Sequence, residues 1–455
     1  MPAGRRYARP EVAVALLTAL MMVGAYYSKM PCFGTETLGS LPFHNLDARV
    51  FGSMCYSDIQ ALWDGRHLGQ HLLPYVHGGL SNGNTLAPGT LEYPVLSGLL
   101  VYVLALPAST QLQFFQISAL FLGLCGILTS VFLARMVGWR SLWFALAPSL
   151  VLYSFLNWDL SVVLVTVAAI LCVRRGTREG VLSGRWLAGA AVLLGVGGSL
   201  KFYPLMFAAP VALYVLFDSG VGNGMRRGVA RGWAGLRWRG AGLFLALAAS
   251  VFVAINLPFV LIDFQGWLSA YAFQWSRPID ATTQSIWYWG LRPLTDADSA
   301  LQPALGQVST AATALGLGVA LASGLFRVAK GRQYPWLEVS AAMLSAYLVL
   351  NKVHSPQYVL WLLPFLVLLR VRAGWVIAYL IADVLVGTGW YFMLTGGSDI
   401  RTGLGAQMLV LGVWGRPALL VGLCFAYFSA GPAWLRRRPA EPVPALAPEP
   451  APLRV

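Results

Sequence analysis

The stretch LEYPVLSGLLVYVLAL (residues 91–106) decides how the rest of the chain is threaded through a membrane. It is apolar, but Pro94 and Gly98 interrupt it and Pro107 ends it. If it crosses, every later connector changes side. If it lies along the interface, 23 of the 32 Lys and Arg residues share the side of the N-terminus and 9 face the other side. Because Lys and Arg concentrate in cytoplasmic loops, we predict an interfacial helix at 91–106 and two cytoplasmic termini.

The composition is that of an integral membrane protein. The chain has 455 residues, of which 57% are hydrophobic and 11% charged, and its mean hydropathy is +0.65; soluble domains carry about 25% charged residues. Long apolar runs divided by Arg-rich connectors indicate helices, since the strands of a membrane barrel are short and alternate. The net charge of +14 then reports topology, and we expect no nucleic-acid partner.

We predict an all-α, polytopic protein of the plasma membrane with about twelve transmembrane helices. Its large first extracytoplasmic loop, 30–111, would contain interfacial helices. Several predicted spans are shorter than the ~20 residues of a simple crossing, which fits a fold whose outer half is cut away by a cavity. The spans are predicted at 11–29, 112–134, 141–157, 160–173, 186–200, 203–217, 240–262, 303–326, 338–351, 357–370, 374–394 and 417–432.

Residues 1–433 are predicted to form one transmembrane domain, followed by a Pro-rich, disordered cytoplasmic tail at 434–455. Cys32 and Cys55 share the first loop, and both a disulfide and two free thiols fit their positions. The five cysteines show no metal-binding spacing, and no nucleotide-binding motif is present. We therefore expect neither a metal nor a soluble cofactor.

Asp58, in Tyr56-Ser57-Asp58-Ile59, is the principal candidate for chemistry. An ionisable group at membrane depth costs roughly 2.5–3.5 kcal/mol on insertion scales, so it is a functional candidate by default. A carboxylate at the bilayer edge could deprotonate a hydroxyl while the substrates stay anchored in lipid. The structural alternative is that Asp58 caps an interfacial helix, beside Ser57.

Other polar residues predicted at the outer face have structural alternatives as well. Glu92 could anchor the interfacial helix, and Asp159 could form the turn Asn157-Trp158-Asp159. Lys201 could extend its ammonium to the headgroups, and Arg416, before Pro417, could contact a headgroup. Asp383 lies within a predicted span, and the sequence assigns it no role.

The turn Asn351-Lys352-Val353-His354-Ser355-Pro356-Gln357-Tyr358 is more polar than a plain connector requires. It combines two groups that can be cationic with several amide and hydroxyl donors. The segment 263–300 is rich in aromatic residues, which could form an interfacial belt or a platform for stacking sugars. A carboxylate together with several cations suits the displacement of a lipid-linked phosphate by a hydroxyl, because the cations stabilise the departing anion.

Four short motifs resemble the GT-C superfamily of glycosyltransferases that use polyprenyl-phosphate sugars. The similarity is strongest to glycosyltransferase family 87, the actinobacterial mannosyltransferases that elaborate phosphatidylinositol mannosides. It extends over about 50–365 and rests on Tyr56-Ser57-Asp58-Ile59, Leu91-Glu92-Tyr93-Pro94-Val95-Leu96-Ser97-Gly98, Lys201-Phe202-Tyr203-Pro204, and Ser355-Pro356-Gln357-Tyr358 followed by Leu360-Trp361-Leu362-Leu363-Pro364.

The resemblance implies a GT-C fold with an extracytoplasmic active site and Asp58 as the general base. The donor would be polyprenyl-phosphate mannose, transferred with inversion to a hydroxyl of a glycolipid or glycan acceptor; relatives also use arabinose. A transporter or flippase of lipid-linked sugars is the alternative. Membrane lipids would surround the site. The residues predicted to bind substrate are Glu92, Tyr93, Asp159, Lys201, Tyr203, Lys352, His354, Gln357 and Arg416.

Overall fold

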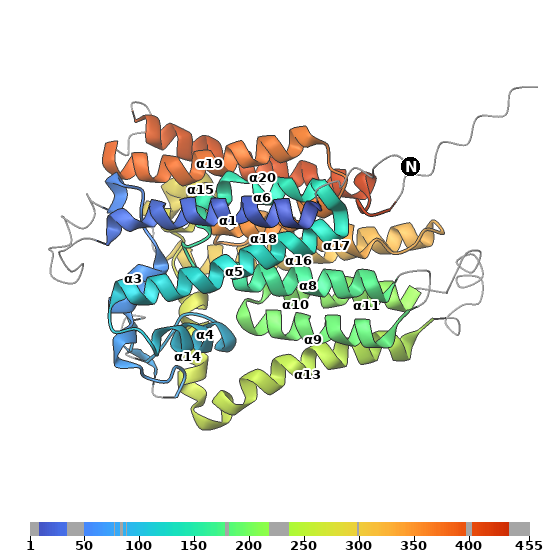
Figure 1. The fold of residues 1–455 in the computed structure, drawn as a ribbon, viewed down its shortest axis with the longest axis horizontal. Coiled ribbons are helices and arrows are strands. Elements are labelled where there is room, and N and C mark those ends of the chain that lie inside the picture. Colours follow the sequence, from blue (N-terminus) through green and yellow to red (C-terminus); the bar gives the residue numbers. More distant parts are fainter. Residues whose placement is uncertain are drawn as a thin grey trace, which may run out of the picture.

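Nearly all of the described chain is helical. The computed structural model describes residues 9–33, 50–76, 78–81, 85–87, 89–177, 182–217, 236–297, 300–396 and 403–435. Figure 1 shows most of the helices running alongside one another, parallel to the long axis of the molecule. The first loop also contains an antiparallel pair of two-residue strands, β1 (Leu80–Ser81) and β2 (Thr85–Leu86).

Among the described residues, six helices are long and apolar enough to cross a membrane. In α5, Thr110 caps the first turn by accepting a hydrogen bond from the Gln113 backbone at 3.2 Å, and Gly138, at φ +60°, ends the helix. The chain is therefore a multi-pass membrane protein. The six helices are α1 (Pro10–Lys29), α5 (Gln111–Val137), α13 (Trp238–Ile262), α16 (Leu301–Ala329), α19 (Ala373–Gly396) and α20 (Leu404–Ala430).

Shorter helices occupy the other predicted spans. The ten residues of α18 reach only about 15 Å into a hydrocarbon core of ~30 Å, so the number of complete crossings stays a prediction. These helices are α6 (Leu142–Ala145), α7 (Pro148–Tyr153), α8 (Asp159–Gly176), α9 (Gly184–Leu200), α10 (Tyr203–Met206), α11 (Ala208–Phe217), α17 (Trp336–Leu350) and α18 (Val359–Leu368).

The remaining elements lie in the connections between these helices. The segment 263–300, predicted as an aromatic-rich loop, contains three of them, α14, η6 and α15. The elements are η1 (Met30–Cys32), α3 (Asp58–Gly65), η2 (Leu68–Gln70), α4 (Val95–Ala105), η3 (Gly138–Ser141), α14 (Phe264–Ser276), η6 (Ala281–Thr283), α15 (Ile286–Ala297) and η7 (Pro356–Tyr358).

One end of the bundle is tied together by arginine side chains. Arg140 donates hydrogen bonds to the carbonyls of Val367 at 2.8 Å and Leu369 at 2.7 Å, at the end of α18. Arg327, at the end of α16, donates to the carbonyl of Phe428 in α20. Because helix carbonyls at a C-terminus have no partners of their own, these guanidinium groups satisfy them.

The first loop begins and ends at the opposite end of the bundle. Gln60 of α3 donates to the carbonyl of Cys32 at 2.8 Å, and Gln111, the first residue of α5, donates to the carbonyl of Gln60 at 3.0 Å. The end of α1 and the start of α5 therefore meet on α3. The intervening α4, with 11 residues, lies at this same end (Figure 1).

The prediction for the final helix was wrong. It was expected to start at residue 417, with Arg416 at its outer end, but α20 begins at Leu404 and Arg416 lies in its middle, fully buried. Its Nη1 lies 3.7 Å from Oδ1 of Asp383 in α19. The other carboxylate oxygen of Asp383, Oδ2, accepts a hydrogen bond from the Ser149 hydroxyl at 2.7 Å. The ion pair keeps a cation inside an apolar bundle, and it gives Asp383 a structural partner.

Cys32 and Cys55 form a disulfide, which joins the end of α1 to the segment just before Asp58. Both sulfurs are buried, and Cys55 also packs with Val50. Of the two alternatives that the sequence left open, a disulfide or two free thiols, the structure has the disulfide. Most of the predicted disordered tail, 436–455, lies outside the described residues.

Candidate active site

A cavity of about 1610 Å³ lies at the end of the bundle that holds α3. It exists because α9 and α17 end, and α18 begins, short of this end of the bundle, so the connections after α9 and between α17 and α18 line an open space. The cavity brings together seven of the ten residues predicted for the site. These are Asp58, Glu92, Tyr93, Lys201, Tyr203, Lys352 and Gln357.

Asp58 is the first residue of α3, and hydrogen bonds to the segment 155–157 hold it in place. Its backbone N–H donates to the carbonyl of Leu156 at 2.8 Å, and the Ser57 hydroxyl donates to that of Phe155 at 2.6 Å. The carboxylate accepts hydrogen bonds from the Tyr56 hydroxyl and from Asn157, each at 2.8 Å. Ser57, at the N-cap, makes no side-chain cap, and the Asp58 carboxylate is engaged elsewhere, so a capping role does not explain either residue.

The surroundings of Asp58 raise the pKa of its carboxyl group. Burial raises the pKa of Asp58, although the hydrogen bonds from Asn157 and Tyr56 oppose that shift. The charge of Asp58 in turn raises the pKa of Tyr56, so the phenol stays protonated and donates. A carboxylate with a raised pKa binds a proton more readily than an ordinary aspartate, which suits general-base catalysis near neutral pH.

Lys201 follows the last residue of α9 and points into the cavity wall instead of toward headgroups. Its Nζ donates to Oδ1 of Asp159 at 2.7 Å, and its side chain is 14% exposed. Three rings surround the ammonium, with centroids at 5.9 Å (Tyr93), 5.7 Å (Tyr358) and 5.3 Å (Trp361). Burial is the largest single influence and lowers the pKa of Lys201, but the charge and hydrogen bond of Asp159, together with the charges of Tyr358 and Asp58, outweigh it and raise the pKa, so the amine stays cationic.

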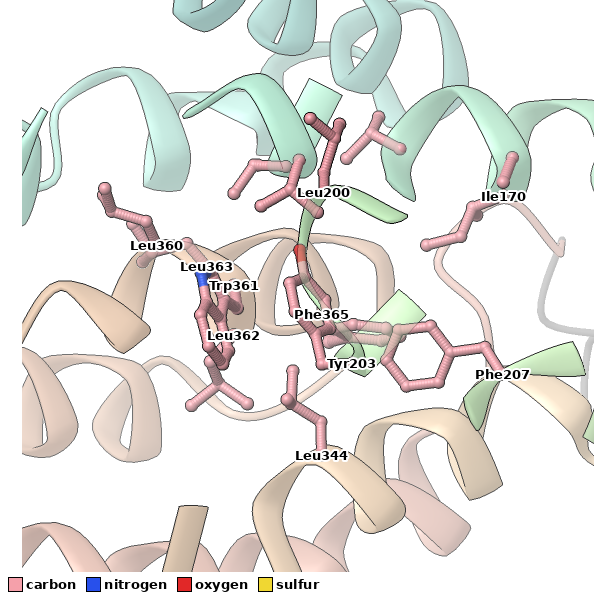
Figure 2. Packing of buried hydrophobic residues seen from close by; sticks show 14 of the residues in the cluster. Ile170, Leu200, Tyr203, Phe207, Leu344, Leu360, Trp361, Leu362, Leu363 and Phe365 are labelled. Atoms are coloured by element: carbon pink, nitrogen blue, oxygen red, sulfur yellow. The ribbon is translucent and has the colours of Figure 1, made fainter. Parts of the chain in front are cut away.

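Stacked aromatic rings pack against Lys201, and two of them, Tyr203 and Trp361, are labelled in Figure 2 among the buried hydrophobic residues. Tyr203 and Trp361 lie 4.4 Å apart at an angle of 14°, and Tyr358 stacks on Trp361 at 3.8 Å. The indole N–H of Trp361 donates to the same Asp159 oxygen that Lys201 contacts, at 2.7 Å. Asp159 is fully buried beside these rings, so it orients Lys201 and Trp361 and does not line the cavity.

Asn157 connects the carboxylate to the cation. Its Nδ2 donates to Asp58 at 2.8 Å and to the Tyr93 hydroxyl at 3.0 Å, and the Tyr93 ring in turn faces Lys201. The order along the cavity wall is therefore Asp58, Tyr93, Lys201. A carboxylate and a cation therefore both lie beside Tyr93, the carboxylate through Asn157 at its hydroxyl and the cation over its ring.

The turn at 351–358 closes another part of the cavity wall. Lys352 donates to the carbonyls of Trp275 at 2.7 Å and Arg277 at 2.8 Å, which ties the end of α17 to the end of α14. Burial, and then the Arg277 charge, lower the pKa of Lys352. Gln357 lines the cavity and is 6% exposed.

Glu92 lines the cavity but is already paired with a cation. It accepts a hydrogen bond from Arg66 Nε at 2.8 Å, and its backbone carbonyl accepts one from Gln274 at 2.9 Å. The pair ties the segment before α4 to the end of α3, which agrees with the structural alternative of an anchor. Asp58, unlike Glu92, accepts its hydrogen bonds from a hydroxyl and an amide in place of a cation.

Three residues predicted to bind substrate do not line the cavity. Asp159 lies below Lys201, and Arg416 lies within α20, where it pairs with Asp383. His354 is 1% exposed; its backbone N–H donates to Thr283 at 2.8 Å. Burial and the Arg416 charge lower the pKa of His354 well below its ordinary value, so the ring is neutral. Their side chains support the wall of the cavity from behind.

Several residues that the sequence did not single out belong to the site. Asn157 was considered only as a turn former, Trp361 only as part of a motif, and Lys29 only as the end of the first span. Lys29 lines the cavity and donates to the Tyr56 carbonyl at 2.9 Å. Tyr391, in α19, lines the cavity within electrostatic reach of Asp58. For Lys29 and Asn157, the signal in the sequence was a polar side chain at the end of a predicted span.

The aromatic segment 263–300 contributes to the cavity as well as to packing. Tyr271, Phe273 and Trp275 of α14 line the cavity. Trp267 instead donates its indole N–H to Asn256 of α13 at 3.1 Å. The segment is therefore neither a simple belt nor a single platform. In the described part of the chain, no group of three or more His, Cys, Asp or Glu side chains is arranged to hold a metal ion.

A search of curated proteins found no match. Among solved structures, the chain is similar to ArnT from Cupriavidus metallidurans, whose crystal structure contains undecaprenyl phosphate. The identity is 15% and the TM-score 0.42, and the match covers 91% of this chain and 78% of that chain. Residues 156–396 match the family described as Mannosyltransferase (PIG-M), and because this is more than half of the 455 residues, the chain belongs to that family of mannosyltransferases.

Proposed function

We propose that the protein transfers a mannosyl residue from polyprenyl-phosphate mannose to a hydroxyl of a glycolipid or glycan acceptor, with inversion at the anomeric carbon. The observation that carries the proposal is the order Asp58, Tyr93, Lys201 along one cavity wall. Inversion by direct displacement requires the base and the leaving group on opposite sides of the reacting carbon. The mannosyl ring would lie over Tyr93, between the two charges.

The reaction is a single displacement. The Asp58 carboxylate removes the proton of the acceptor hydroxyl as its oxygen bonds to the anomeric carbon, and the bond from that carbon to the phosphate oxygen breaks. The polyprenyl phosphate leaves with the bonding electron pair, and the proton remains on Asp58 until solvent takes it. The leaving group departs as an anion and needs no acid. Lys201 stabilises its growing charge.

Lys201 is suited to a phosphate because its ammonium stays charged and only one of its N–H groups has a side-chain acceptor, Asp159. Lys352 is less free, since two carbonyls already accept its hydrogen bonds. We therefore assign the phosphate to Lys201, with Lys352 holding the wall beside it. His354 takes no direct part in this scheme, because its neutral ring lies behind the cavity wall.

A lipid-linked donor accounts for the size and position of the cavity. About 1610 Å³ exceeds the few hundred to 1,000 Å³ typical of small-ligand sites. The cavity lies at the end of the bundle opposite the arginine-tied end, and the positive-inside rule puts arginine-rich ends in the cytoplasm. We therefore place the reaction on the extracytoplasmic face, both termini in the cytoplasm, and the donor's polyprenyl chain in the bilayer.

The proposal is tested with purified protein in lipid vesicles, radiolabelled polyprenyl-phosphate mannose and membrane glycolipids. The expected result is a mannosylated lipid whose new linkage is α, from a β-linked donor. A β-linked product would contradict the single displacement. Movement of intact polyprenyl-phosphate mannose across the vesicle membrane, without any transfer, would instead identify a flippase.

A further inference from the structure

The cavity continues past Asp58, on the side away from Lys201. There it is bounded by the segment 51–56, by α7 and by the outer part of α19. Figure 1 shows α19 along one edge of the molecule and α13 with α14 along the opposite edge, with α3 between them. The Asp58 carboxylate contacts Tyr56, which lines the part of the cavity beside α19, and through Asn157 it contacts Tyr93, beside which Lys201 lies; we therefore distinguish an α19 side and an α14 side of the cavity.

A close helix approach shapes the α19 side. A Cβ added to Gly387 would lie 2.3 Å from the hydroxyl oxygen of Tyr153 in α7, so a larger residue there would force the buried Tyr153 side chain to shift. Trp390 and Tyr391 follow three and four residues later and share its helix face. Gly387, Trp390 and Tyr391 all line the cavity, so the approach to α7 presents both aromatic rings to it.

Two further aromatic residues complete this wall. The Phe51 ring lies 6.3 Å from that of Tyr391, and Tyr56 donates its hydroxyl to Asp58 at 2.8 Å. Trp and Tyr offer an apolar ring face and one hydrogen-bonding group each. A sugar or cyclitol ring has the matching properties, because its C–H groups form an apolar face and its hydroxyls form a polar rim.

We propose that Phe51, Tyr56, Trp390 and Tyr391 form the acceptor subsite and bind the terminal sugar or cyclitol ring of a membrane glycolipid. The assignment rests on the proposed function, in which the donor's phosphate lies at Lys201. A displaced phosphate on one side of the anomeric carbon requires the attacking hydroxyl on the other. The hydroxyl that Asp58 deprotonates must then come from the α19 side.

The helices beside this wall favour an acceptor that carries a lipid. On α1, Val23 is 51% and Tyr27 67% exposed, and on α19, Phe392 is 44% and Leu394 43% exposed. These large apolar side chains would face lipid, next to the ring-binding wall. A glycolipid can keep its acyl chains in the bilayer there while its head group reaches Asp58.

Steady-state kinetics with Trp390→Leu and Tyr391→Phe test the assignment. For Trp390→Leu we expect the acceptor KM to rise about tenfold or more through loss of the aromatic face, with the donor KM unchanged. The matched control is Tyr271→Phe, on the α14 side, for which the acceptor KM should stay within about twofold. A rise in the donor KM alone for Trp390→Leu would overturn the proposal.

A photolabelling experiment separates failure of the subsite from failure of the proposed function. The probe is an alkyl mannoside with a diazirine on its sugar, in vesicles with the full chain, and cross-linked peptides are mapped by mass spectrometry. Cross-links within 50–58 or 387–391 that excess octyl mannoside removes support the subsite, even if no donor is turned over. Competed cross-links confined to 270–284 or 303–317, or no competed cross-link, overturn it.

Discussion

Removing the positive charge of Lys201 should have two separable effects, one on stability and one on donor use. Lys201 and Asp159 form a pair at 2.7 Å, with the Asp159 side chain fully buried and that of Lys201 14% exposed. Lys201→Met leaves the carboxylate with only the Trp361 N–H and with Oδ2 unpartnered. Breaking a buried pair in this way costs about 3–5 kcal/mol.

The double variant Lys201→Met with Asp159→Asn removes both charges and keeps an oxygen for the Trp361 N–H. We expect it to regain most of the lost stability, because no uncompensated charge remains. Its activity should stay low, since a hydrogen bond from a charged donor contributes about 1.5–3 kcal/mol, equivalent to about 10- to 150-fold in rate.

The assay combines thermal unfolding in detergent with initial rates at varied concentrations of polyprenyl-phosphate mannose. The pairing of the two variants separates a structural role from a role in donor binding. If the double variant recovers both the stability and the donor dependence of the natural protein, Lys201 serves only to neutralise Asp159, and the phosphate binds elsewhere.

Three further predictions concern the base, the buried ion pair and the topology. Because the pKa of Asp58 is raised and the base must be ionised, kcat/KM should fall with decreasing pH at a higher pH than an ordinary aspartate would give; Tyr56→Phe, which removes a stabilising hydrogen bond, should move this fall to still higher pH, and an unshifted profile would contradict the assignment. Arg416→Leu should destabilise the protein by about 3–5 kcal/mol, and adding Asp383→Leu should restore most of the loss; an equally unstable double variant would show that the pair has another role. Cysteine at Thr177, at the end of α8, should resist a membrane-impermeant thiol reagent applied to intact cells, whereas cysteine at Ser109, just before α5, should react; the reverse pattern would invert the topology.

The helices could be predicted from the sequence because apolar runs and Arg-rich connectors are local signals. The start of α20 could not, because Arg416 in isolation indicates a connector. Its partner, Asp383, lies in another helix, and the two neutralise each other only when α19 and α20 pack together. The number of membrane crossings and the GT-C assignment stay predictions.

The site was predictable where a polar residue lies in a short motif, as with Asp58, Lys201 and Gln357. Which of the acidic residues faces the cavity and which is buried in an ion pair could not be predicted from the sequence. Asp159 has the same charge as Asp58, yet it is buried beneath a lysine, while Asp58 faces the cavity. Burial and pairing depend on contacts between distant helices, and Asn157, which bridges Asp58 and Tyr93, has no chemical signal of its own in the sequence.

The most direct test of the mechanism is the turnover of Asp58→Asn. Asparagine keeps the size of the side chain, and its oxygen can still accept the hydrogen bond from Asn157, so folding should be intact. Glu92→Gln is the matched control, because Glu92 lines the same cavity but is paired with Arg66. We predict that Asp58→Asn lowers kcat at least ~10²-fold, whereas Glu92→Gln changes it much less. A well-folded Asp58→Asn protein with the natural rate would contradict the account.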